Sequence, residues 1–262
     1  LELFALVINP EVNGDSLVGA LKINHTIRDL NIRVRKLGAG GAQVIATALK
    51  NGRNFEKFAI EAAEDDPIQQ TASQAIFDAL NLNHRLKEVE IEQEIKNHSA
   101  ISVANFLKTN QNITCLNLTK GWIRGTGLAF IAEAMKINDK IQELHLNNNM
   151  IGVEGAKTFA ETLRSTKRLR FCNLANNCFK ARGAVLLAEG MKVNRNVESF
   201  YLSGNRIECV GAIAWAEVLR CNTKLQDCRL AGNCIGIKGV IALGDALVHN
   251  TSLKEIDLSH NG

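Results

Sequence analysis

One phrase of nine residues recurs through the second half of the chain, and its constant period constrains the fold more than any other feature. The phrase reads Ile-x-x-Leu-x-Leu-x-x-Asn and is followed, in its fullest copies, by Ile-Gly-x-x-Gly-Ala. Copies begin 28 residues apart, at Ile141, Leu169, Val197, Leu225 and Leu253. Their closing asparagines are Asn149, Asn177, Asn205, Asn233 and Asn261. A fixed period of this length predicts an array of equivalent structural units.

The first half of the chain continues the same register at less regular intervals. Further copies begin at Leu1, Ile27, Phe55, Leu86 and Ile113, which makes ten predicted strand positions in all. Within one copy, residues 144–146 alternate between apolar and polar side chains, as a strand does, and residues 184–191 place apolar side chains every three or four positions, as a helix does. One unit cannot bury these apolar faces alone, so the units must stack.

The phrase is typical of leucine-rich repeats, and units of 27 to 29 residues with a full helix resemble those of the ribonuclease-inhibitor type. The resemblance implies an α/β solenoid, or horseshoe, with a parallel sheet on the concave face and helices on the convex face. We expect residues 1–262 to form a single leucine-rich-repeat domain of about nine full repeats plus a partial last one. Because the chain begins and ends inside a phrase, we also expect that terminal capping repeats are missing from it.

Two recurring polar or small residues receive structural interpretations. A glycine-rich segment at residues 38–41 lies where a phosphate-binding loop would be sought. However, Gly38 and Gly41 occupy the positions of Gly152 and Gly155 in the repeat, so we interpret them as residues of a tight strand-to-helix turn. The closing asparagine of the phrase can satisfy backbone groups of neighbouring loops through its side-chain amide. In the second to fifth units this position holds Arg35, Ala63, Glu94 and Gly121 instead, so we expect the ladder of asparagines to be broken there.

The cysteines indicate a reducing environment. Cys172 and Cys228 replace core leucines, and Cys178 and Cys234 are two repeats apart, about 10 Å, which is too far for a disulfide. We therefore expect a cytoplasmic protein. No apolar run is long enough to cross a membrane and no leader is visible. The sequence contains no Cys-x-x-Cys pair and no His/Cys cluster, so it predicts no metal and no cofactor.

One set of residues could serve in nucleophilic catalysis. Cys115 and His145 both point out of the predicted sheet, with Asn117 and Asn173 beside the histidine. Cys115 is displaced from His145 by one strand and two residues, a diagonal of roughly 7–8 Å, and a regular sheet face supplies no oxyanion donor. We therefore expect no catalytic residue and no enzyme activity.

The predicted concave face carries a charge opposite to that of the whole chain. Outward-facing strand positions are the third, fifth and seventh of each phrase. They hold nine acids (Asp29, Glu61, Glu88, Glu90, Glu92, Glu143, Asp227, Glu255 and Asp257) and three bases (Arg33, Lys57 and Arg229), a net charge of −6, whereas the chain totals +4. Such a surface repels nucleic acid and attracts a protein with a basic contact surface.

Aromatic residues occupy the less charged middle of this face. Phe171 and Tyr201 project from predicted strands, and Trp122 and Met150 follow the asparagine position, whereas Trp215 aligns with core residues of the helices. Aromatic anchors within a charged surround are typical of binding sites. The predicted partner-binding residues are Glu88, Glu90, Glu92, Asn117, Trp122, Glu143, His145, Met150, Phe171, Asn173, Tyr201, Asp227, Arg229, Glu255 and Asp257.

The resemblance implies a non-catalytic module, monomeric on its own, that grips a folded partner protein in the concave face. Some ribonuclease-inhibitor-like proteins block an enzyme in this way by occluding its active site. Similar repeats occur in cytosolic eukaryotic sensors and in effectors of intracellular bacteria, which are delivered to the host cytosol, so the origin stays open.

Two alternatives rest on resemblance alone. The Ran GTPase activator is similar in architecture, and Arg35 and Arg206 lie where a rim arginine could reach a nucleotide, although no activating motif matches residue by residue. The repeats also resemble those of tropomodulin, which implies an actin-capping or cytoskeletal scaffold.

Overall fold

The computed structural model describes residues 4–7, 10–34, 38–52, 54–62, 70–92 and 96–262. Strands and helices alternate throughout. In order, they are β1 (Phe4–Val7), α1 (Pro10–Ile23), β2 (Asp29–Val34), α2 (Gly38–Asn51), β3 (Lys57–Ala62), α3 (Gln70–Leu80), β4 (Glu88–Glu92), α4 (Lys96–Thr109), β5 (Cys115–Asn117), α5 (Arg124–Ile137), β6 (Glu143–His145), α6 (Gly152–Ser165), β7 (Phe171–Asn173), α7 (Lys180–Val193), β8 (Ser199–Tyr201), α8 (Glu208–Cys221), β9 (Asp227–Arg229), α9 (Gly236–Leu247) and β10 (Glu255–Asp257).

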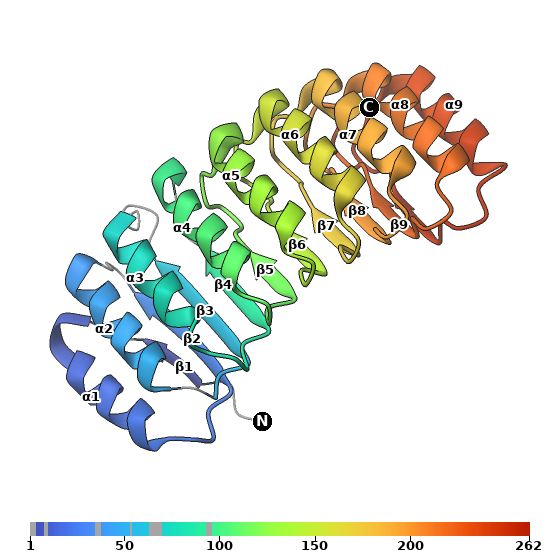
Figure 1. Ribbon diagram of the computed structural model, residues 1–262. Helices are drawn as coiled ribbons and strands as arrows, with labels where there is room; N and C mark the ends of the chain where they lie inside the picture. Colours follow the sequence, from blue (N-terminus) through green and yellow to red (C-terminus); the bar gives the residue numbers. More distant parts are fainter. Residues whose placement is uncertain (1–3, 8–9, 35–37, 53, 63–69, 93–95) are drawn as a thin grey trace.

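All ten of these strands form one parallel sheet in sequence order. Each strand pairs in register with the equivalent residues of the next repeat, so that Leu116 lies beside Leu144 and Leu144 beside Cys172. The helices lie along the other side of the sheet, each packed on the helix before it in the sequence (Figure 1). The structure therefore confirms the predicted α/β solenoid and its strand register, while the predicted strand start at Leu1 lies outside the described residues.

The core lies between the sheet and the helices. In β5 through β9 the middle residue is buried and its two neighbours are more exposed, and along β4 buried and partly exposed residues alternate. Cys172 and Cys228 are fully buried, and Trp215 packs against Phe200 with ring centroids 5.1 Å apart. These positions confirm the core assignments made from the repeat register. All seven cysteines are free thiols.

A ladder of buried asparagines ties consecutive repeats together. The side-chain amide nitrogen of Asn205 donates to the carbonyls of Leu174 and Leu202, each at 2.9 Å. The side-chain oxygen of Asn205 accepts from the backbone N–H of Asn177 at 2.8 Å. Asn233 repeats this pattern one unit later, at 2.9, 2.9 and 2.7 Å. The predicted structural role of the asparagine position is confirmed.

The glycines of the turn serve two different purposes. Gly152 and Gly236 have φ values of +67° and +64°, which a glycine adopts at least cost, so the turn interpretation is correct for their position. At the second glycine of the repeat, the position of Gly155 and Gly239, the interpretation as a turn residue is wrong. A Cβ on Gly155 would lie 2.1 Å from Cγ2 of Ile151, and one on Gly239 would lie 2.3 Å from the equivalent isoleucine, so these glycines allow close packing. Residues 35–37, which precede Gly38, lie outside the described part of the chain.

No helix within the described ranges is long and apolar enough to cross a membrane.

Replacing Asn205 with alanine is expected to lower the free energy of unfolding by on the order of 3 kcal/mol, because several buried backbone groups lose their partners at about 1 to 3 kcal/mol each. Urea unfolding followed by circular dichroism measures the change. The exposed Asn105 of α4 provides a matched control, and Asn105→Ala is expected to change stability by less than about 0.5 kcal/mol. Equal unfolding midpoints for the two variants would contradict the role assigned to the ladder.

Candidate functional site

Among the described side chains, the concave face is formed by the outward residues of β2 through β10. All nine acids and three bases predicted for this face lie on the described strands and are exposed or partly exposed. Adjacent strands of a sheet lie about 4.8 Å apart, so residues separated by 28 positions in the sequence become direct neighbours. The predicted contact residues of β4 through β10 therefore form one continuous surface, and Trp122 and Met150 flank it on the loops that follow β5 and β6.

An aromatic row crosses the middle of this surface. The ring centroids of His145 and Phe171 lie 4.8 Å apart, and those of Phe171 and Tyr201 lie 4.9 Å apart in an edge-to-face arrangement. The guanidinium carbon of Arg229 lies 4.5 Å from the centroid of the Tyr201 ring, a cation–π contact. These four side chains, from β6, β7, β8 and β9, are called the aromatic row below. Each remains partly exposed, so the row packs internally and still presents a surface to a partner.

The polar end of the row is held by Asp227. Its carboxylate accepts a hydrogen bond of 2.6 Å from the Tyr201 hydroxyl and lies 3.4 Å from the Arg229 guanidinium. Arg229 also lies 3.3 Å from a carboxylate oxygen of Glu255. The sequence places these residues on one face but does not predict the hydrogen bond and ion pairs between them, because these interactions join different positions of the phrase on adjacent strands.

The acidic block at β4 is partly neutralised. The Lys57 ammonium lies 2.7 Å from Glu88 and 3.2 Å from Glu90, and Asn117 donates a hydrogen bond of 2.9 Å to the second of these carboxylates. Burial lowers the pKa of Lys57, but its bonds to the two glutamates outweigh this effect and leave the pKa above its ordinary value. Lys57 is therefore charged at neutral pH, and its charge is already paired with these two glutamates.

Several acids of the concave face keep their charge available. Arg33 pairs with Glu61 at 2.8 Å, which together with the pairs above accounts for all three bases of the face. Among the described residues, Asp29, Glu92, Glu143 and Asp257 form no salt bridge, although Lys120 attracts the Glu92 carboxylate and Arg229 attracts that of Asp257. Burial and the adjacent charge of Glu90 raise the pKa of Glu92, since both oppose its ionisation. A cation that approached this surface would relieve that repulsion.

Trp122 and Met150 occupy equivalent rim positions and are among the more exposed large apolar side chains, at 44% and 51%. Both have left-handed backbone, with φ of 51° and 53°. Such backbone is uncommon for residues with large side chains. Arg206 occupies the same rim position two repeats after Met150, is exposed and has a φ of 54°, whereas Arg35 lies outside the described residues.

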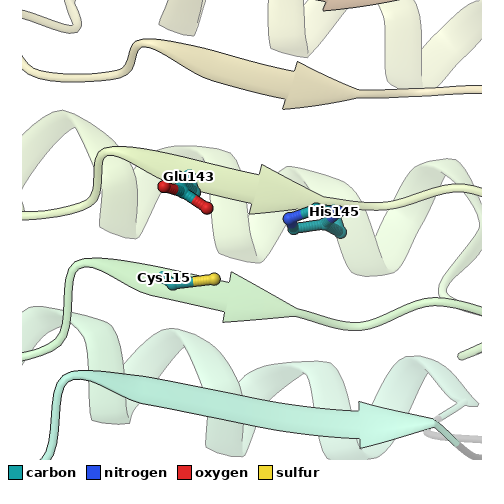
Figure 2. A group of neighbouring side chains, drawn as sticks. All are labelled: Cys115, Glu143 and His145. Carbon is teal, nitrogen blue, oxygen red and sulfur yellow. The ribbon is translucent and has the colours of Figure 1, made fainter.

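Cys115, Glu143 and His145 come closer together than the sequence indicated. Their sulfur, carboxylate and imidazole ligand atoms all lie within 4.8 Å of one another (Figure 2). The register pairs Cys115 with Glu143, so Cys115 and His145 lie one strand and two residues apart, as predicted. The expectation of no His/Cys cluster followed from sequence spacing and is corrected, because the three side chains converge across the two strands.

The ionisation state of this group does not favour a nucleophile. Burial, followed by the charges of Glu88 and Glu143, raises the pKa of the Cys115 thiol to about 12, so the thiol is protonated at neutral pH. Burial also lowers the pKa of His145, and this effect outweighs the opposite effect of the nearby carboxylates. A neutral imidazole beside a neutral thiol lacks the charge pairing that activates catalytic cysteines.

Comparisons with known proteins agree with this architecture. A family model described as Leucine Rich repeat matches residues 109–132, 138–160, 221–244 and 249–262. No curated protein matches the chain.

Three solved structures illustrate the structural likeness. The structure of leiomodin-1 actin-binding site 2 is 26% identical over 48% of this chain and 76% of its own, with a TM-score of 0.46. A chain in the crystal structure of the yeast Rad7 and Elc1 complex is 11% identical over 100% of this chain and 64% of its own, with a TM-score of 0.60. A protein from Bacteroides fragilis is 10% identical over 100% of this chain and 75% of its own, with a TM-score of 0.60. The last two matches show a shared fold.

Tyr201 is the only tyrosine of the chain, so its ionisation can be measured directly. Burial and the hydrogen bond to Asp227 raise its pKa from 10.0 to about 12. We expect a phenolate absorbance midpoint near 12 in the folded protein and near 10 after unfolding. The contribution of the neutral phenol to stability is complete below pH 10 and is lost as the pH rises toward 12.

The variant Asp227→Asn separates the two causes of this shift. It removes the negative charge that opposes ionisation, so the midpoint should fall toward 10 while the burial of the ring is unchanged. A wild-type midpoint near 10 in the folded protein would contradict the bonding described for the aromatic row.

Proposed function

Because the chain is a leucine-rich repeat protein, we propose that it is a non-catalytic binding module that grips a folded partner protein in its acidic concave face. The observation that carries the proposal is the aromatic row, a preorganised strip of partly exposed aromatic side chains with acidic residues at both ends. Leucine-rich repeats use extended surfaces of this kind for protein interaction.

The aromatic row has the properties of a binding anchor. Phe171 contacts a ring on each side, which limits its rotation before a partner arrives. Tyr201 is restrained by Asp227 and Arg229. Binding by restrained side chains loses less conformational entropy than binding by mobile ones. Tyrosine, arginine and other large side chains also contribute a disproportionate share of interface energy.

The charge pattern favours a partner with a basic contact surface. All three bases of the concave face form salt bridges with acids of the same face, whereas Glu92, Glu143 and Asp257 form no salt bridge among the described residues. A basic surface that docks here gains Coulomb attraction and a faster encounter. Nucleic acid phosphates are repelled by the same charges. Where the partner is an enzyme, docking of this kind would occlude its active site.

Replacing both Phe171 and Tyr201 with alanine is expected to weaken partner binding by at least about 2 kcal/mol, or roughly 30-fold, because the two central rings are removed. The measurement uses the immobilised chain to capture proteins from a cell lysate, identification by mass spectrometry, and titration of the purified partner against wild type and variant. Circular dichroism first confirms that the variant is folded.

Two charge reversals complete the design. Glu90→Lys lies on the concave face and should slow association, whereas Glu161→Lys lies on the convex helix α6 and should leave affinity unchanged. An activity assay on the captured protein then separates inhibition from recruitment. A partner retained by the alanine variant and lost by Glu161→Lys would move the function to the helices.

A further inference from the structure

We propose that Cys115, Glu143 and His145 form a binding site for a divalent transition-metal ion of the zinc type. The three candidate ligand atoms lie within 4.8 Å of one another. Figure 2 shows Cys115 on β5 and the other two residues on β6, with the sulfur displaced along β5 toward the side on which His145 lies and the imidazole at the edge of β6 that faces β5. This inference does not depend on the proposed protein-binding function.

The spacing is close to what such an ion requires. Zinc binds sulfur at about 2.3 Å and nitrogen or oxygen at about 2.0 to 2.2 Å, so neighbouring ligand atoms of a tetrahedral site lie about 3.3 to 3.8 Å apart. The group must therefore contract by roughly 1 Å. Rotations of the three side chains, of which Glu143 is exposed, can supply this movement without a shift of the paired strands.

The donor set selects the class of metal. A thiolate and an imidazole suit zinc and related transition metals, whereas calcium and magnesium prefer sites made entirely of oxygen. Three protein ligands leave a fourth position for water or another ligand, as in open zinc sites. That position faces outward, because all three side chains project from the concave face.

Carboxylates outnumber bases around this site. Glu88 and Glu90 act electrostatically on both Cys115 and His145, while Lys57, which pairs with both glutamates, opposes them at Cys115. Negative charge therefore remains to attract a cation. A bound divalent cation favours the thiolate form of Cys115 over the thiol. The S–H bond then breaks, the proton passes to solvent, and the sulfur electron pair coordinates the metal. The neutral imidazole already has a lone pair to donate, and the Phe171 ring restrains its orientation.

Competing interactions are few at this site. Among the described residues, the side chains of Cys115, Glu143 and His145 form no hydrogen bond or ion pair. A metal ion would thus gain three ligands without breaking an existing pair.

Titration of the metal-free chain with Co²⁺, which shows a thiolate charge-transfer band, tests the proposal, and competition with Zn²⁺ gives the zinc affinity. We expect one ion per chain. Cys115→Ser should abolish the band. Glu143→Gln and His145→Gln should weaken binding by more than about 100-fold, since even outer-shell partners of metal ligands contribute 10- to 100-fold. Cys178→Ser, at an exposed and distant thiol, is the control and should bind like wild type.

The outcomes are decisive in either direction. Absence of the band in folded wild-type protein, or its persistence in Cys115→Ser, would overturn the proposal. If Cys115→Ser does not fold, as judged by circular dichroism, the exposed Glu143→Gln variant decides, and an unchanged affinity there would also overturn it. A rise in melting temperature with Zn²⁺ in wild type, lost in Glu143→Gln, provides a second reading that needs no spectroscopic metal.

Discussion

In the regular half of this molecule, the hydrogen bonds of one buried asparagine hold each repeat to the next. These asparagines are Asn149, Asn177, Asn205, Asn233 and Asn261, whereas the second to fifth repeats have Arg35, Ala63, Glu94 and Gly121 at this position. The Asn177 side-chain amide donates to carbonyls of its own repeat and of the preceding one, and its oxygen accepts from the backbone of Asn149. A buried backbone group left without a partner costs on the order of 1 to 3 kcal/mol, so each of these asparagines allows a sharp turn to be buried at the end of its strand. The ladder therefore supports the register that places equivalent residues of β6 through β10 side by side.

That register explains why the concave face can be a functional surface at all. A single strand of three residues presents only a few side chains, but parallel stacking places those of neighbouring repeats within contact distance. His145, Phe171, Tyr201 and Arg229 touch in succession although each comes from a different repeat. Cys115 reaches the two outward residues of β6 in the same way. The binding module and the metal site we propose both follow from one geometric rule applied to different side chains.

Charge divides the molecule along the same boundary. The strand positions that face outward carry an excess of acids, while the chain as a whole is basic. The bases of the concave face form ion pairs such as Lys57 with Glu88 and Arg229 with Glu255. The remaining acids therefore determine the electrostatic potential at this surface. Burial, together with this potential, raises the pKa of the Cys115 thiol, and the same potential would stabilise a cation. Both proposals thus depend on the negative charge of the concave face. In one a basic protein surface neutralises this charge, and in the other a divalent metal ion does.

The fold, the strand register and the inward or outward direction of the described strand residues were predictable from the sequence alone, because they depend on a periodic pattern of apolar side chains, which repeats every 28 residues from Ile141 onwards. It also separated Trp215, which is buried, from Phe171 and Tyr201, which face outward. Buried asparagines at the helix ends, such as Asn138 and Asn194, were missed although they recur at multiples of the same period.

Which of the outward residues contact one another is decided by the tertiary structure. The convergence of Cys115 with Glu143 and His145, the bond from Tyr201 to Asp227 and the packing role of Gly155 all depend on side-chain rotamers and on close approach between repeats. A repeat pattern specifies backbone positions, and neighbouring positions on a sheet permit several side-chain contacts. The choice among them is made by burial, charge and shape in three dimensions, which no periodicity encodes.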